Sequence, residues 1–313
     1  MARKHLASLA RVPDARAAGV SGARRESLEK IRSEFGVEVF RDREELFERC
    51  DAVDICLPTF LHCEAAAAAA AAGRHVLCEK PLAMSVAEAE EIIRACGEAG
   101  VLLMTAHCLR FWPEYMFLEE SAGGGEHGAL LELSCRRFGG FPGWASGGWL
   151  GDAEKSGGPA VDLHIHDADF IAHVAGLPAA VRSGEVRTEN VWSVFSEFVY
   201  EDGPRARAEA GWFLKEGYTF RQGYRAVFES AVIEFSSDRA EAPLVIYREG
   251  AVPELPVPPP GDAYVRQLEY FTDCVLSGRW PERSDGRAGL EALRLALAAR
   301  ESARLGEPVI LIK

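Results

Sequence analysis

The stretch DICLPTFLHCEAAAAAAAAGRHVLCEKPLAM, residues 54–84, decides the fold of this chain. A short apolar run at 53–57 is typical of a strand that is buried on both faces. Residues 61–72 predict a helix that ends at Gly73, and residues 75–78 predict the next strand. Because a strand, a helix and a second strand follow one another so closely, they form a βαβ unit in a parallel sheet.

Polar side chains follow both strands of this unit. They are Pro58, Thr59 and His62 after the first strand, and Glu79, Lys80 and Pro81 after the second. In open parallel sheets ligands bind beyond the carboxyl ends of the strands. The sequence therefore predicts the chemistry of the protein at this edge of the sheet.

The flanking sequence extends the pattern into a doubly wound parallel sheet. Further strands are expected at 15–20, 37–40 and 102–106, and helices at 24–35, 42–49 and 85–99, the last two opening with capping boxes at Asp42/Glu45 and Ser85/Glu88. A helix is expected at about 159–175. Runs of alternating polarity over 180–247 then predict a large, mostly antiparallel sheet with one open face. The fold class is α/β followed by α+β, with a domain boundary near residue 108.

Composition narrows the class of protein. The net charge of −13 disfavours nucleic acids and anionic membranes as partners. The eight cysteines include no CxxC pair, which argues against a disulfide framework or a cysteine zinc site and favours a reducing cytoplasm. No apolar run approaches the length of about 18 residues that a membrane-spanning helix needs.

Three motifs together resemble the Gfo/Idh/MocA oxidoreductases, named after glucose–fructose oxidoreductase, inositol dehydrogenase and a rhizopine-catabolism protein. The motifs are LPTFLH…GRHVLCEKPL at 57–82, AHCLRFWPEY at 106–115 and KSGGPAVDLHIHDADF at 155–170. The resemblance covers essentially the whole chain. It implies an NAD(P)-binding Rossmann domain at 1–108 and a substrate-binding and oligomerisation domain at 109–313. It also implies hydride transfer between a nicotinamide cofactor and a secondary alcohol of a sugar, sugar acid or cyclitol, in a homodimer or homotetramer.

The resemblance also implies roles for individual residues. Lys80 matches the catalytic lysine of the family, and Asp162 and His166 match its characteristic carboxylate and histidine. Pro58, Thr59, His62, Glu79, Lys80 and His107 are expected to bind the cofactor, and Arg110, Trp149 and His164 the substrate. Alcohol oxidation needs a base and a hydride acceptor, and histidine titrates near neutrality. We therefore expect His166 to be the base, Lys80 its electrostatic partner and Asp162 a substrate ligand.

The sequence departs from the family pattern at its start. That pattern begins with a strand and a G-x-G-x-x-G-type turn, whose amides hold the pyrophosphate. Residues 1–5 look like the segment that follows those glycines. Either the true protein is roughly fifteen residues longer, or the strand and turn are absent. The second case supplies the alternative function, a catalytically silent binding or regulatory protein of the same fold.

Cofactor choice depends on the segment VSGARR at 20–25. NAD-specific relatives usually carry an acidic residue here for the ribose hydroxyls. Instead, Ser21, Arg24 and Arg25 are suited to a 2′-phosphate, which favours NADP over NAD. The alternative interpretation is that the arginines simply begin a solvated helix.

Several aromatic and histidine side chains allow more than one interpretation. His164 makes a D-x-H-x-H-D pattern, which suggests a metal site, but we expect no metal because further histidine ligands are few. A packed or substrate-facing His164 is the preferred interpretation. Trp144 and Trp149 lie in a loop that would shape a sugar pocket, an interface or a lid. His5 and His127 are expected at the surface.

Overall fold

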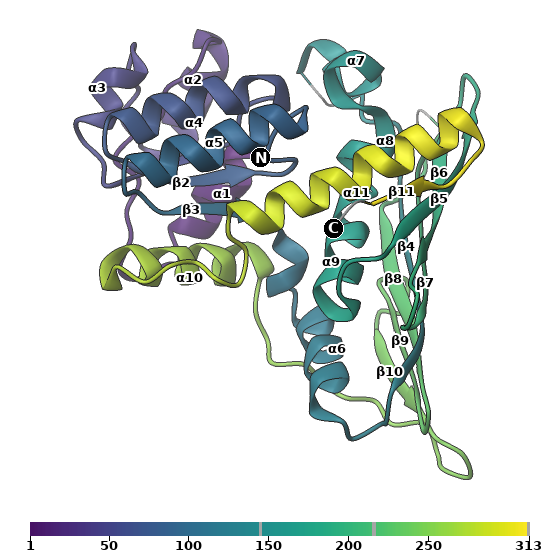
Figure 1. Ribbon diagram of the computed structural model, residues 1–313. Coiled ribbons are helices and arrows are strands. Elements are labelled where there is room, and N and C mark those ends of the chain that lie inside the picture. Colours follow the sequence, from purple (N-terminus) through teal and green to yellow (C-terminus); the bar gives the residue numbers. More distant parts are fainter. Residues whose placement is uncertain (144–145, 215–216, 312–313) are drawn as a thin grey trace. The chain divides into compact units, whose positions relative to one another are not determined.

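The computed structural model describes residues 1–143, 146–214 and 217–311 (Figure 1). The chain forms two compact units, the first made of residues 1–112 and 261–290 and the second of residues 113–260 and 291–313. The predicted boundary at 108 is close to the first of these divisions. The sequence did not predict that a later segment returns to the first unit.

The returning segment joins the first unit because one face of α10 (Ala263–Ser277) is apolar. Leu268 and Phe271 of this helix lie in one buried cluster with Leu77 and Met104 of the parallel sheet. Burial of such side chains stabilises a fold by roughly 1.5–3 kcal/mol for each one. The helix is therefore part of the core of the first unit.

The first unit contains a three-stranded parallel sheet in the order β1-β2-β3. Besides α10, its elements are α1 (Ala2–Leu9), α2 (Arg25–Phe35), α3 (Arg43–Phe47), β1 (Ala52–Ile55), η1 (Thr59–Leu61), α4 (His62–Ala71), β2 (His75–Glu79), α5 (Val86–Glu98), β3 (Leu103–Ala106) and η2 (Cys108–Phe111). The βαβ unit and the parallel sheet predicted from residues 54–84 are confirmed.

Two local predictions in this unit were wrong. Asp42 precedes α3, but its side chain makes no capping hydrogen bond, whereas the capping box of Ser85 and Glu88 is present. The strands expected at 15–20 and 37–40 are reduced to one parallel bridge between Val20 and Val39. Among the described residues no third strand lies beside that pair, and two short strands alone are only marginally stable.

The second unit is built on an eight-stranded sheet in the order β10-β9-β8-β4-β7-β6-β5-β11, in which only β4 and β7 are parallel neighbours among the described strands. The strands are β4 (Leu130–Gly139), β5 (Ala180–Arg187), β6 (Val191–Val199), β7 (Arg205–Phe213), β8 (Arg221–Phe228), β9 (Val232–Ser236), β10 (Leu244–Tyr247) and β11 (Val309–Ile310). The prediction of a large, mostly antiparallel sheet is confirmed.

The helices of the second unit lie on one side of this sheet (Figure 1). They are α6 (Pro113–Gly124), η3 (Ser146–Gly151), α7 (Ala153–Ser156), α8 (Gly158–Asp162), α9 (Ile165–Ala175) and most of α11 (Gly286–Leu305), whose first turn belongs to the first unit. Among the described residues, no helix is both long and apolar enough to cross a membrane.

The single helix expected at 159–175 is divided into α8 and α9. Its start depends on Gly157 and Gly158, which both have positive φ, at 73° and 69°. The ring of Trp192 lies directly against Gly158, where a side chain would collide with it. Only glycine combines this backbone conformation with so close a neighbour. The glycine pair thus sets the position of α8 on the sheet.

His164 lies between the two helices and is completely buried. Its ring stacks on Phe198 of β6, with 5.8 Å between ring centroids and 16° between planes. Both ring nitrogens are buried and have no hydrogen-bond partner among the described residues. Burial lowers the pKa of His164 from 6.5 to about 4. The residue is packed in the core in the neutral state, and its predicted contact with substrate stays a prediction.

This burial predicts acid sensitivity. The unfolded chain binds a proton at His164 below about pH 6.5, whereas the folded chain does so only near pH 4. The free energy of unfolding therefore decreases as the pH is lowered through this window. Between pH 7 and pH 5 the loss from this group is about 2 kcal/mol. Urea unfolding measures the free energy of unfolding at both pH values. Between pH 7 and pH 5 this free energy should decrease by about 2 kcal/mol less in His164→Phe than in the wild type. An equal loss in both proteins would contradict the assignment, and His173→Gln serves as the control.

Candidate active site

The structure brings together the two polar clusters that follow β1 and β2. The strands are parallel, with Ile55 opposite Cys78, so their carboxyl ends lie at the same edge. His62 connects the loops beyond them. Its Nδ1 lies 2.9 Å from the carbonyl oxygen of Pro81, and its Nε2 lies 2.9 Å from that of Leu57. Burial lowers the pKa of His62, so the ring is neutral. A neutral imidazole has one N–H, so it donates to one of these two carbonyl oxygens and lies against the other.

Glu79, the last residue of β2, and Lys80 after it lie beside an unexpected partner. One oxygen of Glu79, Oε2, accepts the backbone N–H of Lys80 at 3.1 Å, and the other, Oε1, lies 3.0 Å from Nε2 of His5. His5 is 2% exposed, so its expected surface position was wrong. In α1 the buried residues are His5 and Ser8, both polar, so no apolar periodicity in the sequence marks this face.

The other residues of the first unit that the sequence predicts in the site are Pro58, Thr59, His107 and Arg110. Thr59 is buried in η1 and Pro58 is half-buried before it. His107 is buried directly after β3. Nη1 of Arg110 donates to the carbonyl oxygen of Arg283 at 2.8 Å, and Nε of Arg283 donates back to Arg110 at 2.7 Å. The guanidinium of Arg110 therefore fixes the loop that precedes α11.

Ser21, Arg24 and Arg25 lie together in the segment that leads into α2. Arg24 is the N-cap residue, Arg25 is the first residue of the helix, and both side chains are exposed. A helix N-terminus carries a partial positive charge. The two arginines add to that charge at a point open to an anionic ligand.

Asp162 and His166 are the accessible residues of an otherwise buried segment of the second unit. Residues 156–171 are described throughout, and all of them are buried except these two, which are half-buried. Asp162 ends α8, and His166 is the second residue of α9. The fold thus lets two groups capable of proton transfer and hydrogen bonding reach solvent from a rigid segment.

A buried ion pair holds the start of α9 on the sheet. Arg137 of β4 binds Asp167 with both ends of its guanidinium, Nε to Oδ2 at 2.9 Å and Nη2 to Oδ1 at 3.1 Å. Nη1 of Arg137 donates to Gln222 at 2.5 Å. Burial raises the pKa of Asp167, while the charge of Arg137 opposes that change. Because Asp167 follows His166 directly, this ion pair fixes the backbone that carries the predicted base.

Trp149 packs against a hydrophobic cluster that includes Ala160 of α8. It is half-buried and packs against the buried cluster that contains Leu150, Trp192 and Trp212. Trp144, predicted in the same loop, lies outside the described residues. The loop is thereby joined to the glycine-rich segment that leads to Asp162.

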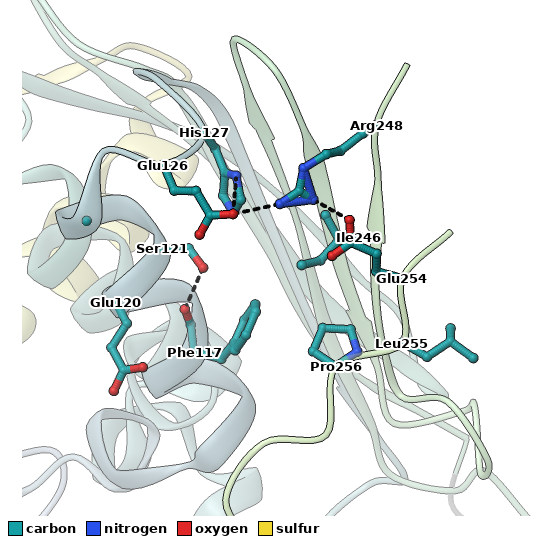
Figure 2. Close-up of a pocket in the computed structure, with 11 residues that line it drawn as sticks. Phe117, Glu120, Ser121, Glu126, His127, Ile246, Arg248, Glu254, Leu255 and Pro256 are labelled. Carbon is teal, nitrogen blue, oxygen red and sulfur yellow. Dashed lines mark hydrogen bonds and ion pairs between the residues drawn. The ribbon is translucent and has the colours of Figure 1, made fainter. Parts of the chain in front are cut away.

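The second unit also has a pocket of about 530 Å³ between the end of α6 and the chain around β10 (Figure 2). Arg248 crosses it and pairs with Glu126 at 2.9 Å and with Glu254 at 2.8 Å. His127, expected at the surface, is 2% exposed in its wall, so that expectation was wrong. None of the site residues predicted from the sequence lines this pocket. We therefore do not assign the reaction to it.

Two family models match the chain. Residues 1–107 match the oxidoreductase family with an NAD-binding Rossmann fold, and residues 115–234 match the GFO/IDH/MocA C-terminal domain. The two matches follow one another in the order that the motifs indicate. Together they cover most of both units.

Individual proteins agree with the family models. A myo-inositol 2-dehydrogenase of Thermotoga maritima is 28% identical over 95% of this chain and 92% of its own length. The D-xylose 1-dehydrogenase (NADP(+)) 2 of Haloferax volcanii is 30% identical over 83% of this chain and 80% of its own. The crystal structure of an aldose-aldose oxidoreductase from Caulobacter crescentus, 23% identical, shares the fold with a TM-score of 0.84 over 99% of this chain and 96% of its own. The chain therefore belongs to the Gfo/Idh/MocA family of oxidoreductases.

Proposed function

We propose that this oxidoreductase transfers hydride between a nicotinamide cofactor and a secondary alcohol of a sugar, sugar acid or cyclitol. The observation that carries the proposal is the position of His62 between the two loops at the carboxyl edge of the parallel sheet, where dinucleotides bind in such folds. The similar proteins named for myo-inositol and D-xylose support the substrate class. Because these relatives are named dehydrogenases, a catalytically silent protein is not favoured.

The residues at this edge fit a nicotinamide cofactor. Beyond β1, Pro58 is half-buried and Thr59 is buried, and both are uncharged. Glu79 is the last residue of β2, and His107 follows β3. When bound, the cofactor supplies the hydride acceptor or donor. The protein has to bind it, orient the substrate and move the alcohol proton.

We assign these tasks to three side chains. His166 takes the proton of the alcohol, because imidazole titrates near neutral pH and is half-buried at the start of a fixed helix. Lys80 supplies positive charge, which favours neutral imidazole and stabilises the developing alkoxide. Asp162 accepts hydrogen bonds from substrate hydroxyls. The accessibility of Asp162 and His166 in a buried segment supports these roles.

The catalytic assignment is tested by Lys80→Met and His166→Ala. Loss of an acid–base or charge-stabilising group should lower kcat by about 10²–10⁴-fold. Steady-state turnover with NAD(P)+ and a panel of inositols, aldoses and sugar acids measures the effect. Lys30→Met and His173→Ala, at an exposed lysine paired with Glu26 and a histidine paired with Glu119, are the controls. Wild-type turnover in either test variant would refute the role assigned to that residue.

We propose NADP as the preferred cofactor, supported by Arg24 and Arg25 at the N-terminus of α2 and by the naming of one relative for NADP(+). Energy transfer from tryptophan to reduced nicotinamide should show that NADPH binds about tenfold more tightly than NADH, as expected for a charge-assisted phosphate contact. The double variant Arg24→Ala/Arg25→Ala should abolish the difference, whereas Lys30→Ala should keep it. Tighter NADH binding by the wild type would reverse the assignment.

We also propose that the uncovered face of the large sheet joins copies of the chain into a homodimer or homotetramer. Phe195 and Val186 are 57% and 52% exposed on neighbouring strands, and an apolar surface of this kind favours association. Static light scattering should give twice or four times the chain mass of 34.1 kDa. Phe195→Glu should shift the mass toward that of the monomer, and a monomeric wild type at micromolar concentration would exclude the proposal.

The cysteines support the expected cytoplasmic location. All eight are free thiols, and five of them are buried. Free thiols persist in a reducing compartment.

A further inference from the structure

His5 lies inside the first unit between two carboxylates from different strands. It is on the inner face of α1 and only 2% exposed. Its Nδ1 lies 2.7 Å from Oδ2 of Asp54 on β1, and its Nε2 lies 3.0 Å from Oε1 of Glu79 at the end of β2. One ring therefore connects a helix to two neighbouring strands of the parallel sheet.

This geometry defines the charge of the ring. An ionised carboxylate only accepts hydrogen bonds, so both ring nitrogens must donate and the imidazole must carry two protons. Burial by itself would lower the pKa of His5, but the charge of Asp54 and its hydrogen bond outweigh that effect, and the pKa is raised. Burial likewise would raise the pKa of Glu79, but the hydrogen bond and charge of His5 lower it. His5 and Glu79 form a charged pair at neutral pH.

Two further side chains, Cys56 and Tyr264, lie close to the ring. Cys56 faces Oδ1 of Asp54 at 3.6 Å, and burial raises the pKa of its thiol to about 12, so the thiol is neutral. Tyr264 of α10 lies at a ring-centroid distance of 5.8 Å and tilted. His5 is thus held by the two carboxylates and packed against an aromatic ring.

The contact with Glu79 reaches Lys80. The free rotation of the Glu79 carboxylate is restricted because Oε1 faces the imidazolium while Oε2 accepts the backbone N–H of Lys80 at 3.1 Å. We propose that His5 is a positioning residue that fixes the carboxylate of Glu79 and, through it, the backbone of the lysine at position 80. The consequence for catalysis rests on the proposed function of Lys80, whereas the structural part of the inference does not.

Single-residue hydrogen exchange tests the structural part without any need for activity. In His5→Gln, which cannot supply a positive charge, the amide of Lys80 should exchange about tenfold faster or more, since its acceptor is no longer held. The amide of Glu88, which is bonded to Ser85 in the capping box of α5, should not change and is the internal reference. His173→Gln, which removes a comparable histidine–glutamate contact of 2.9 Å to Glu119, is the matched control.

A milder variant covers the case in which His5→Gln does not fold. Asp54 has a side chain that is 33% exposed, so Asp54→Asn should be tolerated. It removes one of the two charges that stabilise the imidazolium and should accelerate exchange at Lys80 by a smaller factor, about threefold. Unchanged exchange at Lys80 in a folded His5→Gln protein, or in Asp54→Asn if only that variant folds, would overturn the inference.

Kinetics test whether the position of Lys80 matters for turnover. His5→Gln should lower kcat by about 10²-fold, as expected for a small displacement of a reacting group. In a protein that already carries Lys80→Met, adding His5→Gln should lower kcat by less than about twofold, because both substitutions act through the side chain of Lys80. An undiminished loss in that background would overturn the inference. Faster exchange at Lys80 in a protein without dehydrogenase activity would refute the proposed function and leave the inference intact.

Discussion

The parallel pairing of β1 with β2 is the constraint on which the candidate site of the first unit depends. It places the ends of both strands at one edge of the sheet, with Ile55 opposite Cys78. Loops at such an edge are separate pieces of chain, and the ring of His62 lies between a backbone carbonyl of each, donating a hydrogen bond to one of them. The buried His5 extends the same network to α1. Two histidines of this unit thus organise the backbone around a proposed catalytic lysine.

The second unit obtains rigidity from different interactions. A bidentate ion pair between Arg137 and Asp167 fixes α9, and the close packing of Trp192 on Gly158 fixes α8. Removing one partner of a buried ion pair typically costs about 3–5 kcal/mol, since the other charge is left uncompensated. Asp162 and His166 are carried by these two helices. Their half-exposed side chains therefore stand on backbone that has little freedom to move.

The features predicted from the sequence are those that depend on neighbours along the chain. The βαβ unit at 54–84 and the capping box at Ser85 need only local residues, and both are present. The burial of His5 depends on partners 49 and 74 positions away, which no local pattern specifies. Trp192, which packs on Gly158, is likewise remote from it in sequence. Family motifs identified the residues Asp162 and His166, but the structure was needed to show that the rest of their segment is buried.

The division of the chain has a consequence for synthesis on the ribosome. The backbone passes from one unit to the other after residues 112, 260 and 290, so the first unit is not continuous in sequence. While the segment 1–112 emerges, Leu77 and Met104 lack the side chains of α10 that cover them in the finished core. The first unit therefore cannot complete its core until almost the entire polypeptide has been translated. Nearly all strands of the second unit have been synthesised before that point.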